Sequence, residues 1–302
     1  MTSAGSATLD IFIPYWGDPD LLYATVESVR SQTDDNWRVT VVDDDYPDES
    51  VAAHFQAETD PRIRYLRNDR NLGITGNYDK CRQLATGRLM MFLGCDDVLL
   101  PDYVATVRSA HARFPEAAII QPGVRTIDDD GRLTESLADR VKRALRPRVA
   151  EPTVFGGEPL ATSLLHGDWL YWPSLVFRTD VVRGPAFREG LPIVQDLALI
   201  IDLVAGGALL VLEPTVVFHY RRHSQSASAT SLLTGRRLSD ERRYYGLAAR
   251  QMDERGWTRA GRAARLRWTS RLHGLTLLPS AIGTREPSAV RSVLAHALSV
   301  RD

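Results

Sequence analysis

Residues 89–97 read LMMFLGCDD, a short apolar run followed by a glycine, a cysteine and two aspartates. Residues 39–45, VTVVDDD, repeat this arrangement. Short apolar runs predict buried strands, so each stretch places paired carboxylates directly after a strand. In parallel sheets, ligands bind beyond the carboxyl ends of the strands. We therefore interpret both acidic pairs as candidate ligand-binding groups rather than as solvated turns.

Strands and helices alternate regularly around these two runs. Asp18 and Pro19 suit the N-cap and the first position of a helix. Buried strands separated by helices are typical of βαβ units, which predicts an α/β fold with a mostly parallel sheet covered on both faces. Besides the two runs above, the spacing predicts strands at 9–14 and 63–66 and helices at 19–32, 50–59 and 77–85.

The second half of the chain is predicted to continue this architecture. Residues 134–159 are polar, basic and contain proline, so we interpret them as a flexible segment or lid. Residues 240–272 have helical spacing with frequent arginines. The other expected elements are helices at 102–114 and 194–205, strands at 118–127 and 175–177, an Asp-Gly turn at 128–131 and a strand pair at 209–220.

The composition is that of an ordinary globular protein. The 302 residues are 44% hydrophobic and 25% charged, and the formal net charge of −1 argues against a chain that coats nucleic acid. Cys81 and Cys95 give neither a disulfide framework nor a zinc ribbon. Neither a leader-like start nor an apolar run of spanning length occurs. We expect a cytoplasmic protein, with a peripheral place at the inner membrane face as an alternative.

Charge is distributed unevenly along the chain. Residues 236–302 carry 14 arginines against six carboxylates, although the whole chain is nearly neutral. A basic helical segment with aromatic side chains can lie on an anionic membrane or dock an acidic carrier protein. Packing on the rest of the chain or a homodimer contact is the more ordinary interpretation.

Adjacent carboxylates at a strand end can hold Mg²⁺ or Mn²⁺, and such sites leave positions open for water and substrate phosphates. The sequence has neither a GxxxxGK[ST] loop nor a GxGxxG loop. It therefore predicts another kind of nucleotide site, in which the cation contacts a diphosphate.

Five blocks of the sequence resemble, in order and spacing, family 2 glycosyltransferases with the GT-A fold. The blocks are IFIPYWGDPDLLYATVESVRSQT, VTVVDDDYPDES, IRYLRNDRNLGITGNYDKCRQLATGRLMMFLGCDDVLLPDY, VQDLALIIDLVAGG and FHYRRHSQSAS. The resemblance implies a GT-A type Rossmann-like sandwich at 1–235, with a nucleotide-binding half up to about residue 115 and an acceptor half after it. Residues 236–302 would form a basic helical extension.

The resemblance also implies which residues bind a nucleotide-sugar donor. Pro14 and Tyr15 would line the base, and Asp43 or Asp44 would accept hydrogen bonds from uracil or ribose. Asparagine, glycine and aspartate also suit loop caps and tight turns, so a purely structural role stays open for several of them. The other implied donor contacts are Asn71, Gly73, Asn77, Asp96 and Arg221.

The acidic block of the family, Asp-x-Asp-Asp, is shortened here because Gly94 occupies its first acidic position. The resemblance implies Asp97 as the direct ligand of Mn²⁺ or Mg²⁺. His223, in the Tyr-Arg-x-His block, is implied as a second metal ligand or a contact to the leaving group.

In VQDLAL, Gln195 stands where the family has glutamate, and Asp196 is retained as the implied catalytic base. The implied reaction inverts the anomeric carbon of a UDP-sugar such as UDP-GlcNAc, UDP-glucose or UDP-galactose. The acceptor would be a hydroxyl of a glycan, a lipid, a carrier-bound group or a small natural product. Trp169 and Trp172 are interpreted either as a platform for the acceptor sugar or as core side chains.

Two other functions are alternatives to an inverting glycosyltransferase. Gly94 and Gln195 favour a catalytically silent relative that binds the nucleotide and serves as a scaffold. A nucleotidyltransferase would usually need a loop rich in glycine and lysine near its first strand, and the sequence has none.

Overall fold

The computed structural model describes residues 8–222, 236–283 and 287–298. Its strands are β1 (Leu9–Tyr15), β2 (Trp37–Asp43), β3 (Ile63–Arg67), β4 (Leu89–Phe92), β5 (Val98–Leu99), β6 (Ile119–Ile127), β7 (Leu133–Thr134), β8 (Thr153–Phe155), β9 (Val176–Arg178) and β10 (Leu210–Arg221). Its helices are α1 (Pro19–Arg30), α2 (Ser50–Gln56), α3 (Gly73–Leu84), α4 (Tyr103–Arg113), α5 (Leu137–Leu145), α6 (Gly157–His166), α7 (Thr179–Val182), α8 (Gln195–Ala205), α10 (Arg236–Glu254), α11 (Thr258–Leu266), α12 (Trp268–Thr276), α13 (Leu278–Gly283) and α14 (Pro287–Leu298), with a 3-10 turn η1 (Trp172–Ser174).

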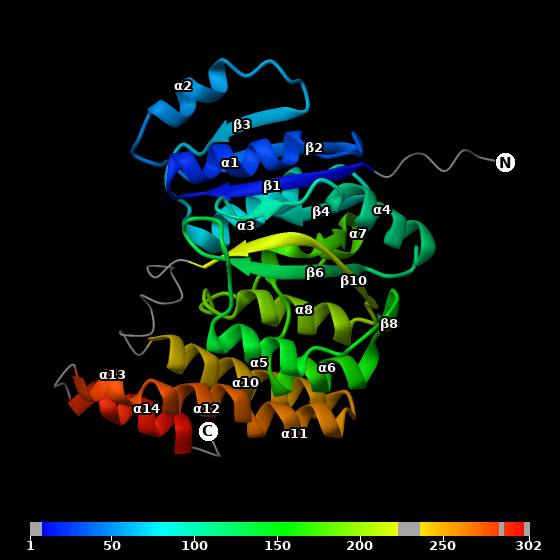
Figure 1. Cartoon of the computed structure of the whole chain (residues 1–302). Coiled ribbons are helices and arrows are strands. Elements are labelled where there is room, and N and C mark those ends of the chain that lie inside the picture. Colours follow the sequence, from blue (N-terminus) through cyan, green and yellow to red (C-terminus); the bar gives the residue numbers. More distant parts are fainter. Residues whose placement is uncertain (1–7, 223–235, 284–286, 299–302) are drawn as a thin grey trace.

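One sheet runs through the molecule in the order β3-β2-β1-β4-β9-β6-β10-β5. The first four strands of this order are parallel, and β6 and β10 are parallel to each other. The strand between them, β9, is antiparallel to both β4 and β6. The arrowheads of β1, β6 and β10 therefore point to the same edge of the sheet (Figure 1). The α/β fold with a mostly parallel sheet is confirmed.

Alternating side chains divide the core between the two faces of the sheet. On β1, Phe12 faces one core, whereas Ile11 and Ile13 face the other. The first core also contains buried residues of α3, α6 and α8, and the second contains residues of α1, α2 and α4. Helices on both faces explain why the strands are apolar without alternation.

The C-terminal helices form a further layer on one side of the molecule (Figure 1). Tyr244, Ala248 and Met252 of α10 and Ala260 and Ala264 of α11 belong to the same buried cluster as α6 and α8. Much of the basic segment therefore packs on the rest of the chain through apolar and small side chains. Among the described residues, none of the helices combines the length and the apolar character that a membrane crossing requires.

Two sequence predictions are corrected. The segment expected to be a flexible lid contains helix α5, which begins with a capping box: the Ser136 hydroxyl accepts from the Asp139 amide, and the Asp139 carboxylate accepts from the Ser136 amide. The strand pair expected at 209–220 is the single strand β10. The chain passes Pro214 within this strand, with shifts of register against β6.

Candidate active site at the carboxyl ends of the strands

Asp43 and Asp44, at the end of β2, are both buried and both hydrogen-bonded. Asp43 Oδ1 accepts from the amide of Tyr46 at 2.7 Å, and Oδ2 accepts from the Tyr65 hydroxyl. Asp44 Oδ1 accepts from Asn68 Nδ2 at 2.7 Å and from the amide of Leu72 at 2.8 Å. Both carboxylates therefore shape the loops of this edge of the sheet, whatever they bind in addition.

The Asn-x-Gly segment at the start of α3 has a clear conformational role. Asn71 Oδ1 accepts from the amide of Gly73 at 2.9 Å. Gly73 has a φ of 73°, a backbone conformation that favours glycine. Asn77 is buried, and its Nδ2 donates to the carbonyl of Val42 at 2.9 Å. These contacts connect α3 to the end of β2, the edge where a donor was expected.

Tyr15 is the last residue of β1, as the resemblance implied. Its side chain is fully buried, and its hydroxyl donates to the Gly17 carbonyl at 2.7 Å. The ring presents no exposed face in this structure, and its contact with a base stays a prediction. Pro14 is half-buried, and the aromatic side chain that is exposed at the end of β1 is Trp16, which packs edge-on against Tyr46.

Asp97 follows β4 and is buried next to the end of β10. Its Oδ1 accepts from the amide of Arg221 at 2.9 Å, whereas Oδ2 is buried without a hydrogen-bond partner. Burial and the nearby charge of Asp96 hold the pKa of Asp97 well above its usual range. A Cβ on Gly94 would lie 2.4 Å from this Oδ2, so the missing side chain at 94 is what makes room for the carboxylate.

The side chain of Arg221 connects two loops at this edge. Its Nε donates to the carbonyl of Asp96 at 2.8 Å, and its Nη1 donates to the carbonyls of Asp128 and Asp129. The guanidinium therefore holds the turn after β6 against the acidic block. His223 lies outside the described residues.

The residues at this edge fit a hard divalent cation, the metal that the resemblance to family 2 implies. A buried carboxylate oxygen without a partner is the kind of donor that Mg²⁺ or Mn²⁺ satisfies. Asp97 supplies that oxygen, and Asp96 is the adjacent carboxylate. The described residues contain no cluster of three or more acidic, histidine or cysteine ligands, so protein groups would supply only part of the coordination shell.

Asp196 is half-buried at the first turn of α8, where its Oδ1 accepts from the amide of Leu197 at 2.8 Å. Burial and the charge of Asp168 raise the pKa of Asp196 to about 6, although Lys142 opposes the shift. Lys142 Nζ lies 3.7 Å from the Asp168 carboxylate. Such a carboxylate is ionised at neutral pH yet basic enough to accept a proton.

Two observations relate the start of α8, where Asp196 lies, to α3. The hydroxyl of Thr75 on α3 donates to Oε1 of Gln195 at 2.7 Å, so the residue beside Asp196 is joined to the Asn-x-Gly helix. Burial raises the pKa of Tyr78, and the nearby carboxylate of Asp196 adds to this rise. The start of α8 is therefore within electrostatic range of a phenol on α3.

Trp169 and Trp172, the two residues considered for an acceptor platform, differ in burial. Trp169 is 1% exposed, and its Nε1 donates to Ser163 Oγ, so it is a core residue and the platform prediction is corrected for it. Trp172 is partly buried and stacks on Phe92 with ring centroids 5.3 Å apart.

The sequence did not indicate a group of hydrogen-bonded residues around α5. Asp139 is almost fully buried, and its Oδ1 accepts from the Tyr171 hydroxyl at 3.0 Å and from Arg222 Nη2 at 2.5 Å. These bonds connect α5 to the end of β10. The capping pattern Ser-x-x-Asp was the one sequence signal that could have revealed this helix.

Comparison with known proteins agrees with this geometry. The sequence profile of glycosyl transferase family 2 matches residues 10–160. The chain belongs to this family. It is 27% identical over 214 residues to the succinoglycan biosynthesis protein ExoO of Rhizobium meliloti, a match that covers 70% of this chain and 60% of ExoO.

A second relative is the UDP-Glc:alpha-D-GlcNAc-diphosphoundecaprenol beta-1,3-glucosyltransferase WfgD of Escherichia coli. It is 31% identical over 90 residues, which is 30% of this chain and 35% of WfgD. The matches therefore span only part of the length of either relative. Among solved structures, TarS 1-349 of S. aureus in complex with UDP-GlcNAc aligns with a TM-score of 0.59 at 12% identity, over 79% of this chain and 65% of TarS. That likeness shows the GT-A fold.

Proposed function

We propose that the protein transfers a sugar from a UDP-sugar to an acceptor hydroxyl with inversion of the anomeric carbon, and that Asp196 is the catalytic base. The observation that carries the proposal is the position of Asp196. It lies in the first turn of α8 with a pKa raised to about 6, and the side chain of Gln195 beside it accepts a hydrogen bond from Thr75 of α3.

The proposed reaction is a single displacement. The acceptor oxygen attacks C1 of the sugar, its proton passes to Asp196, and the bond from C1 to the diphosphate oxygen breaks with its electron pair staying on the diphosphate. A divalent cation, held by Asp97 with Asp96 beside it, would stabilise the negative charge of the leaving diphosphate. Asp43, Asp44, Asn77 and the segment from Asn71 to Gly73 would form the donor side of the cleft.

The donor is proposed to be a uridine diphosphate sugar. WfgD is named for UDP-Glc, and TarS binds UDP-GlcNAc in its solved complex. UDP-GlcNAc, UDP-glucose and UDP-galactose are therefore the first donors to examine.

The test is a screen of these donors with Mn²⁺, Mg²⁺ or a chelator, measuring donor binding and UDP release. Asp97→Ala should weaken metal-dependent donor binding, whereas Asp196→Ala should leave donor binding intact and abolish transfer. An anomeric configuration retained in the product would contradict the displacement, and donor binding indifferent to both metal and Asp97→Ala would contradict the metal assignment.

A catalytically silent, nucleotide-binding relative is the second candidate, because Gly94 and Gln195 stand at positions where the family has acids. In that case the same screen would find donor binding but no release of UDP under any metal condition.

The acceptor is proposed to be met at or near a membrane surface. On α12, Trp268, Leu272 and Leu275 are 43%, 52% and 42% exposed and recur at helical spacing, an apolar stripe on a basic segment that suits an anionic lipid surface. Flotation with anionic vesicles should be lost in Leu272→Asp. A homodimer through the stripe would appear instead as a concentration-dependent mass in sedimentation.

A further inference from the structure

A cavity of about 580 Å³ lies between α5 and the segment after it, and nothing in the proposed reaction uses it. Four arginines line it: Arg140 and Arg143 of α5, and Arg146 and Arg148 of the following segment. Pro214 of β10 lines its other side, and no carboxylate lines it. In Figure 1, α5 lies on the same side of the sheet as α6 and α8.

The charge of this cavity is largely unbalanced. Arg143 lies 2.7 Å from Glu135, but their side chains are 71% and 36% exposed, so solvent screens the pair. Within residues 8–222, 236–283 and 287–298, no carboxylate forms an ion pair with Arg140, Arg146 or Arg148. The carboxylate of Glu213 accepts from Thr215 instead.

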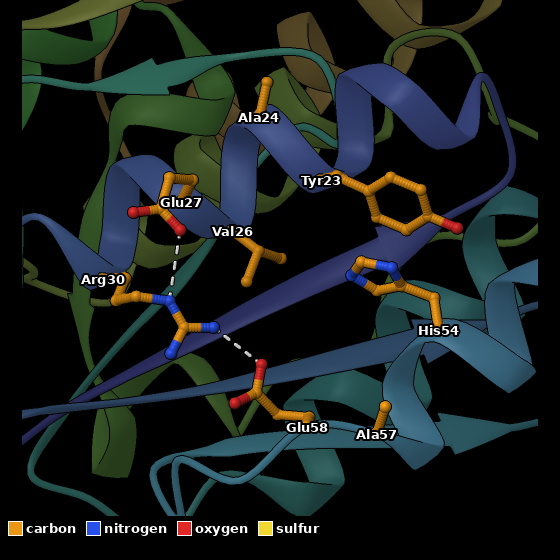
Figure 2. Close-up of a pocket in the computed structure, with 8 residues that line it drawn as sticks. All are labelled: Tyr23, Ala24, Val26, Glu27, Arg30, His54, Ala57 and Glu58. Atoms are coloured by element: carbon orange, nitrogen blue, oxygen red, sulfur yellow. Dashed lines mark hydrogen bonds and ion pairs between the residues drawn. The ribbon is translucent and has the colours of Figure 1, made fainter.

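The groove between α1 and the end of α2 shows the opposite case (Figure 2). It has the same volume, about 580 Å³, and contains one arginine. The Arg30 guanidinium there lies between Glu27 at 3.2 Å and Glu58 at 2.7 Å, so its charge is matched. Arginines without a carboxylate partner are therefore not found in every pocket of this surface.

The guanidinium of Arg146 lacks hydrogen-bond acceptors for some of its N–H groups. Its Nε is buried with no hydrogen-bond partner, and its Nη2 donates only a long bond of 3.4 Å to the carbonyl of Glu213. Burial lowers the pKa of this arginine below its usual range. A buried guanidinium donor without a partner is unfavourable, and an anion in the cavity would satisfy it.

We propose that this cavity binds a phosphate group carried by the acceptor substrate. Guanidinium groups match phosphate oxygens with paired, charge-assisted hydrogen bonds, and several of them suit a dianion better than a single carboxylate. The proposal rests on the proposed transfer function, because it assigns the phosphate to the acceptor. A lipid headgroup and a free phosphorylated sugar share this chemistry.

The place of α5 relates the cavity to the candidate base. The same helix that directs Arg140 and Arg143 to the cavity carries Lys142, which contacts Asp168 and the carbonyl of Leu170. An α-helix with its side chains is about 10–12 Å across. The cavity and the contact to Asp168 therefore lie on the same helix, about one helix diameter apart if they are on opposite sides of it.

The first experiment titrates the protein with inorganic phosphate at low ionic strength by calorimetry. The double variant R140Q/R148Q changes two exposed arginines of the cavity and should bind phosphate about tenfold more weakly or worse. The matched control R64Q/R262Q removes the same charge from exposed positions outside the cavity and should bind like the wild type. Phosphate should also raise the thermal midpoint of the wild type, but not that of R140Q/R148Q.

The second experiment identifies the source of the phosphate by flotation with phosphatidylcholine vesicles, with or without phosphatidic acid. Loss of binding to acidic vesicles in R140Q/R148Q, with R64Q/R262Q unaffected, supports a lipid headgroup. Loss of phosphate binding without any change in flotation supports a free phosphorylated acceptor.

Equal phosphate affinity in R140Q/R148Q and R64Q/R262Q, or no binding to the wild type, would overturn the proposal. Asp196→Ala should keep phosphate binding while it abolishes transfer. Failure of this inference is therefore separable from failure of the proposed reaction.

Discussion

Gly94 and Asp97 compete for the same space: a Cβ on Gly94 would lie 2.4 Å from Oδ2 of Asp97 and 3.0 Å from Oδ1 of Asp96. An aspartate at position 94, as the family pattern has it, is therefore incompatible with the observed position of the Asp97 side chain. The two residues form one structural unit, in which the glycine allows the remaining carboxylate to fold inward. The shortened acidic block is a different arrangement of the site rather than simply a weaker one.

Gly94→Ala should displace the Asp97 carboxylate. We expect a loss of about 1–3 kcal/mol in the free energy of unfolding from overpacking, together with weaker metal-dependent donor binding. Urea denaturation and donor titration in the presence of Mn²⁺ measure the two effects. Gly246, in α10, is the control, because a Cβ there would meet nothing within 4 Å. Gly246→Ala should leave donor binding unchanged, and a Gly94→Ala variant that behaves in the same way would contradict the coupling.

The turnover rate should depend on the ionisation of Asp196. Its pKa of about 6 means that the protonated, inactive form dominates below pH 6, so kcat should fall by about tenfold per pH unit there. Asp168→Asn removes a negative charge that raises this pKa, and should move the acidic limb of the kcat profile to lower pH. Lys142→Met removes a positive charge that lowers the pKa, and should move the limb to higher pH. Shifts in the same direction would rule out this account of the base.

The hydrogen bond between Thr75 and Gln195 should couple the two halves energetically. In a double-mutant cycle of Thr75→Ala and Gln195→Ala, we expect a coupling of about 1 kcal/mol in the free energy of unfolding. Thr75→Ala should also lower kcat more than it weakens donor binding, because it acts through the residue next to Asp196. Thr75→Ser keeps the hydroxyl and serves as the control. Additive effects of the two alanine substitutions would show that the contact carries no coupling.

Asp139 should be the main anchor of α5. Asp139→Ala removes a buried carboxylate that bonds Tyr171 and Arg222, and we expect it to cost about 3 kcal/mol in the free energy of unfolding. Ser136→Ala removes only the cap and should cost about 1 kcal/mol. Urea denaturation of both variants gives the comparison. If both substitutions cost the same, the bonds to Tyr171 and Arg222 contribute nothing beyond the cap.

Most of the architecture could be predicted because its signals are local. Apolar runs such as 39–42 and 89–93 became β2 and β4, and Asp18 caps α1 by accepting from the amide of Asp20. The prediction of a strand pair at 209–220 was wrong, because pairing with β6 on one side and β8 on the other keeps β10 continuous through Pro214.

The candidate site could be predicted only as a set of residues. Paired acids after strands indicated an edge of the sheet, and the resemblance to family 2 added Asp196. The sequence did not show that Tyr15 is buried, that Trp169 is part of the core, or that Arg221 bonds main-chain carbonyls. Each of these depends on neighbours distant along the chain, such as Asp128, which contacts Arg221 from 93 residues away.

The sequence by itself determined the alternation of strands and helices and the carboxylates that follow β2 and β4, because periodicity and turn chemistry act over a few residues. Only the tertiary structure decided that Asp97 keeps an unsatisfied buried oxygen against Gly94, that Asp168 lies near enough to raise the pKa of Asp196, and that four arginines share one cavity. Burial and electrostatic interaction depend on distance in space, and that distance is set by the packing of the whole chain.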